Sequence, residues 1–309
     1  MKAVRVHKFG GPDVLVIDDL PVPSPGPGEL LARVAAAGVG PWDALIREGK
    51  SKVSPPPPLT LGSDLSGVVE AVGTGVAGFK VGDQVYGLTN SQFCGAYAEY
   101  AIASAAMVAR KPQRLTHIEA ASVPVVAVTA WQMLFDYAKV AAGQRVLILG
   151  AAGNVGAYAV QLAAKAKLHV IAAVGSKDPE YVRSLGAETV IDSKAASFQD
   201  SVGPVDVVID TVGGDTQERS FRTLKPGGIL VSVVSTDTLP RRSDVRSVFF
   251  YVDVTTVRLD SITELLDRGD LVTHVGTVLP LAKARTAHEM LAGAPHKRGK
   301  IVLSVSDAI

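Results

Sequence analysis

Hydrophobic residues in the middle of the chain form short β-branched runs separated by helical or turn-rich sequence. The runs cover residues 146–149, 169–174, 188–192, 205–210 and 227–234. After the first run, apolar side chains recur at spacings of three and four from Val155 to Ala166. This spacing predicts a helix with one apolar stripe that packs on a sheet. Strands that alternate with helices predict a parallel sheet with crossover helices.

The first third of the chain has a different pattern. Residues 1–30 alternate as in a β-hairpin before a proline-rich turn, residues 30–39 read as a strand, and residues 41–49 predict a short helix. Residues 61–112 mix glycines with β-branched residues, which is typical of a strongly curved or barrel-like sheet. The segment 116–143 predicts helices that lead into the first parallel strand.

The C-terminal tail returns to the β-rich pattern of the first third. It predicts a helix at 261–269, a strand at 275–281, a second helix at 283–293 and a last strand at 299–305. We therefore expect the tail to complete the first domain. The predicted domains are 1–121 with 259–309, and an inserted domain at 122–258.

A glycine-rich turn follows the first parallel strand. Gly150, Gly153 and Gly156 stand between that strand and the predicted helix, with Ala151, Ala152, Asn154 and Val155 among them. In a dinucleotide-binding unit, the first glycine permits the turn, the second lets the backbone approach the pyrophosphate, and the third lets the helix lie close to the strand. Glycine-rich turns also close many helices that bind nothing, but the alternating strands and helices favour the dinucleotide.

Composition narrows the class of protein. The 309 residues are 47% hydrophobic and carry a formal net charge of +1, so no basic surface for nucleic acid or an anionic membrane is expected. The longest apolar stretches, such as 123–128, are far shorter than the ~20 residues of a membrane span. The N-terminus lacks the pattern of a signal peptide, and Cys94 is the single cysteine, so we expect a cytoplasmic protein without disulfides.

Several motifs in one order resemble a known family. They are KFGGPDVLVI and PVPSPGPGELL near the start, then AAAGVGPWDALIREG, LGSDLSGVVEAVG, VGDQVYG with GAYAEY, and GAAGNVGAYAVQLAAKAK. Together they resemble the medium-chain dehydrogenase/reductase superfamily, specifically its zinc-free quinone oxidoreductase branch of the zeta-crystallin type. This resemblance implies an α/β fold in which a Rossmann doubly wound parallel sheet is inserted in a GroES-like β-barrel catalytic domain. It also implies NADPH as cofactor and, by analogy, a homodimer joined through an apolar edge strand near 248–258.

The resemblance also bears on metal binding. In the zinc-dependent alcohol dehydrogenases of the superfamily, a cysteine and a histidine hold the catalytic zinc at the positions of Gly40 and Ser63. Neither glycine nor serine supplies the ligands that zinc prefers. The cysteines of a structural zinc lobe are also missing, and the six histidines show no ligand spacing. We therefore expect no metal.

The resemblance places the cofactor-binding residues at the ends of the parallel strands. After the second strand come Ser176 and Lys177 rather than an acidic residue, which favours NADPH over NADH. The alternative is that Ser176 caps the next helix and Lys177 is only solvated. Further cofactor contacts are expected at Thr129, Ser193, Val212, Gly213, Ser235, Phe250, Tyr251, Val252 and Lys300. Phe249 and Phe250, which lead into the sixth strand, can instead be core residues.

The residues expected to line the acceptor pocket differ from those of related enzymes, and we assign no catalytic residue among them. Many quinone reductases carry asparagine at the position of Gly40 and a tyrosine at that of Leu45, and Trp42 replaces the proton-relay hydroxyl of the dehydrogenases. The candidates for the pocket are Gly40, Trp42, Leu45 and Ser63. Trp42 either faces the cleft, where flat acceptors would stack on it, or packs into the barrel. Asp43 is expected to be a structural partner.

Three functions remain open from the sequence. The first is an NADPH-dependent quinone oxidoreductase that transfers hydride without metal, because a quinone is already electrophilic. The second is an alkenal or enone reductase that acts on α,β-unsaturated carbonyls with the same cofactor. The third is a nucleotide-binding, crystallin-like protein with little turnover. The expected partner is a small quinone or conjugated carbonyl, and neither nucleic acid nor a membrane.

Overall fold

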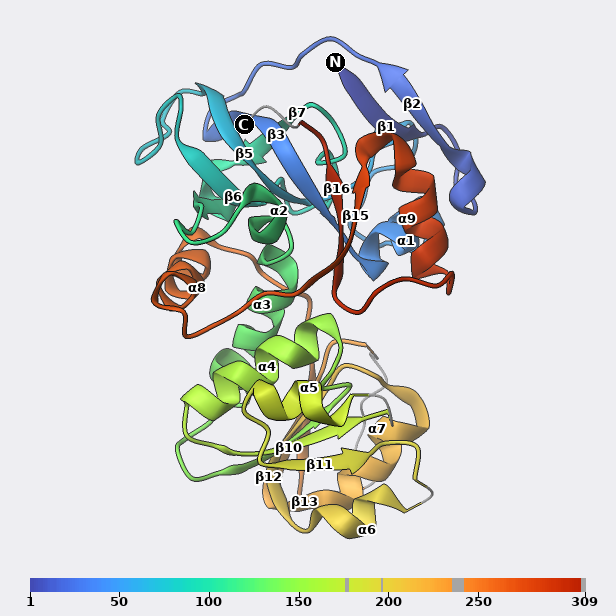
Figure 1. Ribbon diagram of the computed structural model, residues 1–309, viewed down its shortest axis with the longest axis vertical. Coiled ribbons are helices and arrows are strands. Elements are labelled where there is room, and N and C mark those ends of the chain that lie inside the picture. The colour runs from blue at the N-terminus through green and yellow to red at the C-terminus, as the bar shows by residue number, and fades with distance from the viewer. Residues whose placement is uncertain (176–177, 196, 235–241, 307–309) are drawn as a thin grey trace. The chain divides into compact units, whose positions relative to one another are not determined.

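The computed structural model describes residues 1–175, 178–195, 197–234 and 242–306, and Figure 1 shows the course of the chain. The chain divides into two compact units. Unit 1 consists of Met1–Val125 and Val254–Ile309, and unit 2 of Val126–Asp253. The helix α3 (Pro124–Trp131) contains the first boundary between them.

Unit 1 is mostly β-structure. Its strands are β1 (Lys2–Val6), β2 (Leu15–Asp19), β3 (Glu29–Val39), β4 (Leu59–Thr60), β5 (Asp64–Val72), β6 (Gln84–Leu88), β7 (Tyr100–Ser104), β8 (Val108–Arg110), β15 (Val275–Pro280) and β16 (Lys300–Ser304). Its helices are α1 (Pro41–Arg47), α2 (His117–Ala120), α8 (Thr256–Arg268) and α9 (Ala284–Leu291).

The tail of the chain is part of the unit 1 sheet. Among the described residues, one sheet has the order β15-β16-β3-β5-β6-β8, with β7 also paired to β3, and a small sheet has the order β2-β1-β4. The last strand, β16, pairs antiparallel with β3, which begins 271 residues earlier (Lys300 against Glu29). The core of this unit includes apolar side chains of β3, β5, β6 and β16, such as Val34, Leu65, Val85 and Leu303.

Unit 2 alternates strands and helices. Its strands are β9 (Arg145–Leu149), β10 (His169–Val174), β11 (Thr189–Asp192), β12 (Val205–Asp210), β13 (Leu224–Ser232) and β14 (Arg246–Phe249). Its helices are η3, a π-helical turn at Gln132–Tyr137, α4 (Asn154–Lys165), α5 (Pro179–Ser184), α6 (Phe198–Val202) and α7 (Gly214–Ser220).

The parallel sheet expected from the sequence is confirmed. Within the described part of unit 2 the strand order is β11-β10-β9-β12-β13-β14, and each neighbouring pair is parallel. In Figure 1, α4 and α5 lie on one side of this sheet and α6 and α7 on the other. This is the doubly wound order, in which the strands are added outward on one side from β9 to β11 and on the other side from β12 to β14, so the strand order reverses between β9 and β12. Open sheets of this kind bind ligands at the carboxyl ends of the strands beside that reversal.

Two details differ from the expectation. The sixth strand, β14, ends at Phe249, so residues 250–252 follow the strand instead of leading into it. The edge strand expected near 248–258 is therefore wrong in its bounds, because hydrogen bonding to β13 stops at Phe249 and the helix α8 begins at Thr256. The helix α4 is also buried from Gly156 through Ala163 and not only along one stripe, because it contacts the π-helical turn η3 as well as the sheet.

Candidate functional site

The glycine turn in unit 2 lies between β9 and α4. Gly150 has a φ of +72°, a conformation that side chains rarely adopt, and its carbonyl accepts a hydrogen bond of 2.9 Å from the N–H of Gly153. A Cβ on Gly156 would lie 2.2 Å from the carbonyl oxygen of Gly150 and 2.7 Å from the Cα of Ala151. The turn and the helix can therefore approach this closely only with glycine at position 156.

The same turn leaves the start of α4 available to a ligand. Gly153 precedes the helix with extended backbone and is exposed, while Ala151 is fully buried. The first N–H groups of a helix have no partner within it, and the helix dipole adds partial positive charge there. These features are what a pyrophosphate requires: backbone donors, positive potential and no Cβ in the way. The residues present thus fit a dinucleotide.

The other cofactor-binding residues predicted in unit 2 have varied surroundings. Val212 is 45% exposed after β12, and Gly213 has a φ of +75°. The hydroxyl of Ser193 donates a 3.2 Å hydrogen bond to the carbonyl of Val174 at the end of β10. Thr129 lies buried in α3. Ser176, Lys177 and Ser235 lie outside the described residues.

The aromatic residues after β14 differ in burial. Phe250 is buried and stacks on Tyr137 of η3, with 4.2 Å between ring centroids and an interplanar angle of 26°. Tyr251 is 64% exposed, and its ring meets that of Phe249 edge to face. Val252 is half-buried. The packing of Phe250 agrees with the core interpretation, whereas Tyr251 keeps a free surface.

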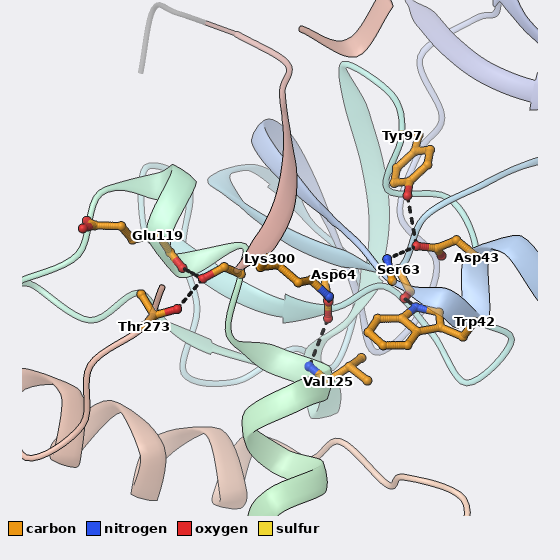
Figure 2. A network of polar contacts seen from close by, with 11 residues as sticks. Trp42, Asp43, Ser63, Asp64, Tyr97, Glu119, Val125, Thr273 and Lys300 are labelled. Atoms are coloured by element: carbon orange, nitrogen blue, oxygen red, sulfur yellow. Dashed lines mark hydrogen bonds and ion pairs between the residues drawn. The ribbon is translucent and has the colours of Figure 1, made fainter. Parts of the chain in front are cut away.

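In unit 1, Trp42 fills the space between Gly40 and Ser63. Its indole N–H donates to Ser63 Oγ at 3.0 Å, as Figure 2 shows. A Cβ on Gly40 would lie 2.3–2.5 Å from three carbon atoms of the indole ring. Trp42 is only partly buried and packs against the unit 1 core. Leu45, on the same helix α1, is 47% exposed and takes no part in this arrangement.

A buried ion pair lies beside the indole. Lys300 Nζ is 2.9 Å from Asp64 Oδ2, and the exposed fractions of these side chains are 2% and 0%. The same ammonium group is 4.2 Å from the centroid of the Trp42 ring, a cation–π distance. Asp64 Oδ1 accepts the N–H of Val125 at 3.1 Å. Burial raises the pKa of Asp64, and Lys300 opposes that rise.

A second buried carboxyl group, Asp43, holds the start of α1. Its Oδ2 accepts the N–H of Gly40 at 2.8 Å. The same oxygen accepts the hydroxyl of Tyr97 at 2.9 Å (Figure 2). Its Oδ1 is buried without a hydrogen-bond partner. Burial raises the pKa of Asp43 to about 7, which the hydrogen bond from Gly40 and the charge of Lys300 only partly offset. Asp43 is thus a structural partner, as expected, and also a group that holds a proton near neutral pH.

A further buried contact in unit 1 joins two side chains that no local sequence pattern connects. Arg47 Nη1 lies 2.7 Å from His288 Nδ1, which is 241 positions later in the chain. Burial, together with the charge of Arg47, lowers the pKa of His288 to about 3, so this histidine is neutral and accepts the hydrogen bond. The pairing joins α1 to α9 and could be found only from the fold.

The arrangement at Gly40 and Ser63 does not fit zinc. The Trp42 ring occupies the space that a side chain at position 40 would need, and the Ser63 hydroxyl already accepts the indole N–H. The ammonium of Lys300 beside the ring adds a positive charge that would repel a metal cation. Among the residues that the structure describes, no cluster of three or more His, Cys, Asp or Glu side chains could hold a metal ion.

Comparisons with known proteins agree with this fold. Residues 26–113 match the model of the alcohol dehydrogenase GroES-like domain, and residues 185–303 match that of the zinc-binding dehydrogenases. The chain is 34% identical to a quinone oxidoreductase of Sus scrofa, covering 98% of this chain and 97% of that protein. The structure of the quinone oxidoreductase from Coxiella burnetii has a TM-score of 0.91 and 33% identity, covering 99% of both chains. That of the CurK enoyl reductase has a TM-score of 0.88 and 26% identity over 99% of both.

The chain belongs to the quinone oxidoreductase branch of the medium-chain dehydrogenase/reductase superfamily. It is therefore an oxidoreductase of a family that uses nicotinamide dinucleotides and acts on small molecules. Unit 2 has the Rossmann-like sheet of this superfamily, and unit 1 contains its GroES-like domain. Among the described residues, no helix has the length and apolar character needed to cross a membrane.

Proposed function

We propose that this oxidoreductase transfers hydride from NADPH to a quinone without a metal. The observation that carries the proposal is the indole of Trp42, which lies against Gly40, donates to Ser63 and has the Lys300 ammonium beside it. With the indole in the space beside Gly40 and the ammonium of Lys300 next to it, these residues do not fit a metal ion that would polarise an alcohol oxygen. A quinone needs none, because its conjugated carbonyl system delocalises the charge that arrives with the hydride.

Within this proposal unit 2 is the cofactor domain, as the segment 122–258 was expected to be, and unit 1 is the catalytic domain. Bound NADPH would supply the hydride. The turn from Gly150 to Gly156 would hold its pyrophosphate through backbone N–H groups. Further contacts are proposed for Thr129, Ser176, Lys177, Ser193, Val212, Gly213, Ser235, Phe250, Tyr251, Val252 and Lys300. The preference for NADPH rests on Ser176 and Lys177, which follow β10 in the sequence.

Trp42, Ser63 and Gly40 form the proposed wall of the acceptor pocket, with Leu45 the remaining candidate from the sequence. An aromatic side chain fixed by a hydrogen bond favours flat, conjugated acceptors, which stack on it without ordering a flexible group. We further propose a homodimer joined through the edge strand β14, and a cytoplasmic location in keeping with the lone Cys94.

A second candidate is reduction of a carbon–carbon double bond conjugated to a carbonyl. The structural likeness to the CurK enoyl reductase favours it, since that protein's name states such a reaction. Both reactions need the same cofactor and the same metal-free pocket. They differ in the atom that receives the hydride, which is the β-carbon of an enone and a carbonyl oxygen or conjugated carbon of a quinone.

Parallel assays of NADPH oxidation with 1,4-benzoquinone and with a short enone test these functions. The proposal predicts faster turnover of the quinone, and a lower KM for NADPH than for NADH. Faster turnover of the enone would favour the second candidate. Tight NADPH binding without turnover of either acceptor would instead indicate a crystallin-like binding protein.

A further inference from the structure

The carboxylate of Asp210 is a fully buried charge at the carboxyl end of β12. None of its surface is exposed, and four hydrogen bonds from within the described residues reach its two oxygens. Every partner is a donor, which suits the ionised, acceptor-only form of the side chain. A buried carboxylate is tolerated only when it is paired or hydrogen-bonded in this way.

The two oxygens serve different segments. Oδ1 accepts the backbone N–H groups of Val212 at 3.0 Å and Gly213 at 2.9 Å, and so fixes the loop after β12. Oδ2 accepts Nε2 of Gln217 on α7 and the hydroxyl of Ser232 at the end of β13, both at 2.7 Å. Asp210 therefore links two neighbouring strand ends and the first turns of the helix between them.

The link extends to the glycine turn. Thr211, which follows Asp210, donates from its hydroxyl to the carbonyl of Leu149 at 2.8 Å. Its oxygen would lie 2.5 Å from a Cβ on Gly150, so it covers the start of that turn. On the other side, the Ser232 hydroxyl accepts the N–H of Val234 at 3.2 Å. Hydrogen bonds thus join the ends of β9 and β12, which flank the reversal of strand order, to the end of the neighbouring strand β13.

We propose that Asp210 is the positioning residue of the cofactor site. It holds the loop after β12 and the end of β13 at a fixed spacing from the glycine turn, and so sets the affinity for the dinucleotide. This inference rests on the proposed function, because it requires that these strand ends bind NADPH. Asp210 itself touches no ligand in this account and acts through the backbone of Val212 and Gly213.

The test compares two aspartates on the same strand. D210N keeps an oxygen for the loop N–H groups but turns an amide N–H₂ toward the donors Gln217 and Ser232. The control, D206N, changes a hydrogen-bonded aspartate at the opposite end of β12, where Asp206 accepts the N–H of Arg145 and pairs with Lys225. We expect D210N to raise the Kd for NADPH at least tenfold, measured from the fluorescence of the reduced nicotinamide, and D206N to leave it within twofold.

A compensating change separates positioning from general stability. In D210N/Q217E the new carboxylate on α7 accepts from the amide that D210N introduces, and we expect the Kd to return to within threefold of the wild-type value. Should D210N fold poorly, S232A removes one donor from Oδ2 and should raise the Kd about threefold to tenfold. A D210N protein that melts earlier but binds NADPH within twofold of wild type would overturn the inference. Failure of the wild-type protein to bind NADPH or NADH would overturn the proposed function instead.

Discussion

The candidate site in unit 2 is formed by backbone, whereas that in unit 1 is formed by side chains. In unit 2 one short stretch, Gly150 to Gly156, supplies the turn, the helix start and the close approach. In unit 1 the site is assembled from three separate segments, which carry Trp42, the adjacent pair Ser63 and Asp64, and Lys300, and which meet only in the folded unit. The backbone site depends on the absence of side chains, and the side-chain site on buried charges that must stay paired. The two regions should therefore fail in different ways when mutated.

The largest loss of stability is expected in unit 1, for the substitution Lys300→Met. It leaves the buried carboxylate of Asp64 without its cation, which should lower the free energy of unfolding by about 3–5 kcal/mol. Urea denaturation measures this loss. The double variant D64N/K300M removes both charges and should recover part of it.

A surface pair provides the control for this loss. Lys2 and Asp19 lie 3.3 Å apart with exposed side chains, so Lys2→Met should cost less than about 1 kcal/mol. A loss below about 1 kcal/mol for Lys300→Met as well would mean that the ion pair is not buried in solution, and the contrast between the units would disappear.

The next effect is the pH dependence that Asp43 gives to unit 1. The folded-state pKa of Asp43 is about 7, raised from 3.8, so the folded protein keeps a proton that the unfolded chain releases. The stabilisation that comes from this raised pKa is therefore fully present below pH 4. It is lost as the pH rises to 7, and the free energy of unfolding should fall by about 4 kcal/mol over this range. D43N cannot titrate, so the difference in unfolding free energy between wild type and D43N should fall over this range.

The pKa of His288 is shifted in the opposite direction to that of Asp43, so its effect on stability has the opposite pH dependence. The D43N variant is needed to separate the two effects. Its folded-state pKa is lowered to about 3, so its contribution to stability grows from pH 3 to 6.5. In the wild type the two trends partly cancel. Subtracting the D43N curve leaves the Asp43 trend alone, and a difference that stays constant from pH 4 to 7 would show that Asp43 is ionised in the fold.

In unit 2 we expect effects on binding rather than on stability. Gly153→Ala places a Cβ 3.2 Å from the Gly150 carbonyl oxygen, so the turn must shift by only a few tenths of an ångström, but the methyl group would face the proposed pyrophosphate site. The Kd for NADPH should rise about 10- to 100-fold, while the free energy of unfolding changes by less than about 1 kcal/mol. Gly156→Ala, whose Cβ would lie 2.2 Å from a backbone oxygen, should impair both. Equal binding losses without any difference in stability would contradict this distinction.

The smallest effect concerns the indole N–H of Trp42. Trp42→Phe removes its 3.0 Å hydrogen bond to Ser63 and should cost about 1 kcal/mol of unfolding free energy. Ser63→Ala removes the other partner. In a double-mutant cycle the two losses should be less than additive, whereas strict additivity would indicate that Trp42 and Ser63 do not interact.

The contrast between the units also explains what the sequence could predict. The β9–turn–α4 unit is local, so the spacing of three glycines and the alternation of strands and helices are enough to find it. The family resemblance indicated Gly40 and Ser63 as pocket residues. It left open whether Trp42 faces the cleft or packs into the barrel. The structure shows the ring packed against the core and bonded to Ser63.

Long-range pairs in unit 1 could not be read from the sequence. Asp64 and Lys300 are 236 positions apart, and Arg47 and His288 are 241 apart, so no local pattern connects them. Lys300 is proposed as a cofactor residue, but nothing local in the sequence indicates that its ammonium lies between Asp64 and the Trp42 ring. The role of Asp210 could not be predicted for a related reason. In the sequence it is only the last residue of a predicted strand, and its hydrogen bonds to the loop after β12, to α7 and to β13 form only in the fold.

We propose above that hydride passes from NADPH to a conjugated acceptor with no metal ion. The most direct test is the rate of NADPH oxidation by 1,4-benzoquinone after exhaustive dialysis against a chelator, with the metal content measured on the same sample. We predict an unchanged rate in protein whose metal content is far below one ion per chain. A rate that falls on chelation and returns with added Zn²⁺ would contradict the account.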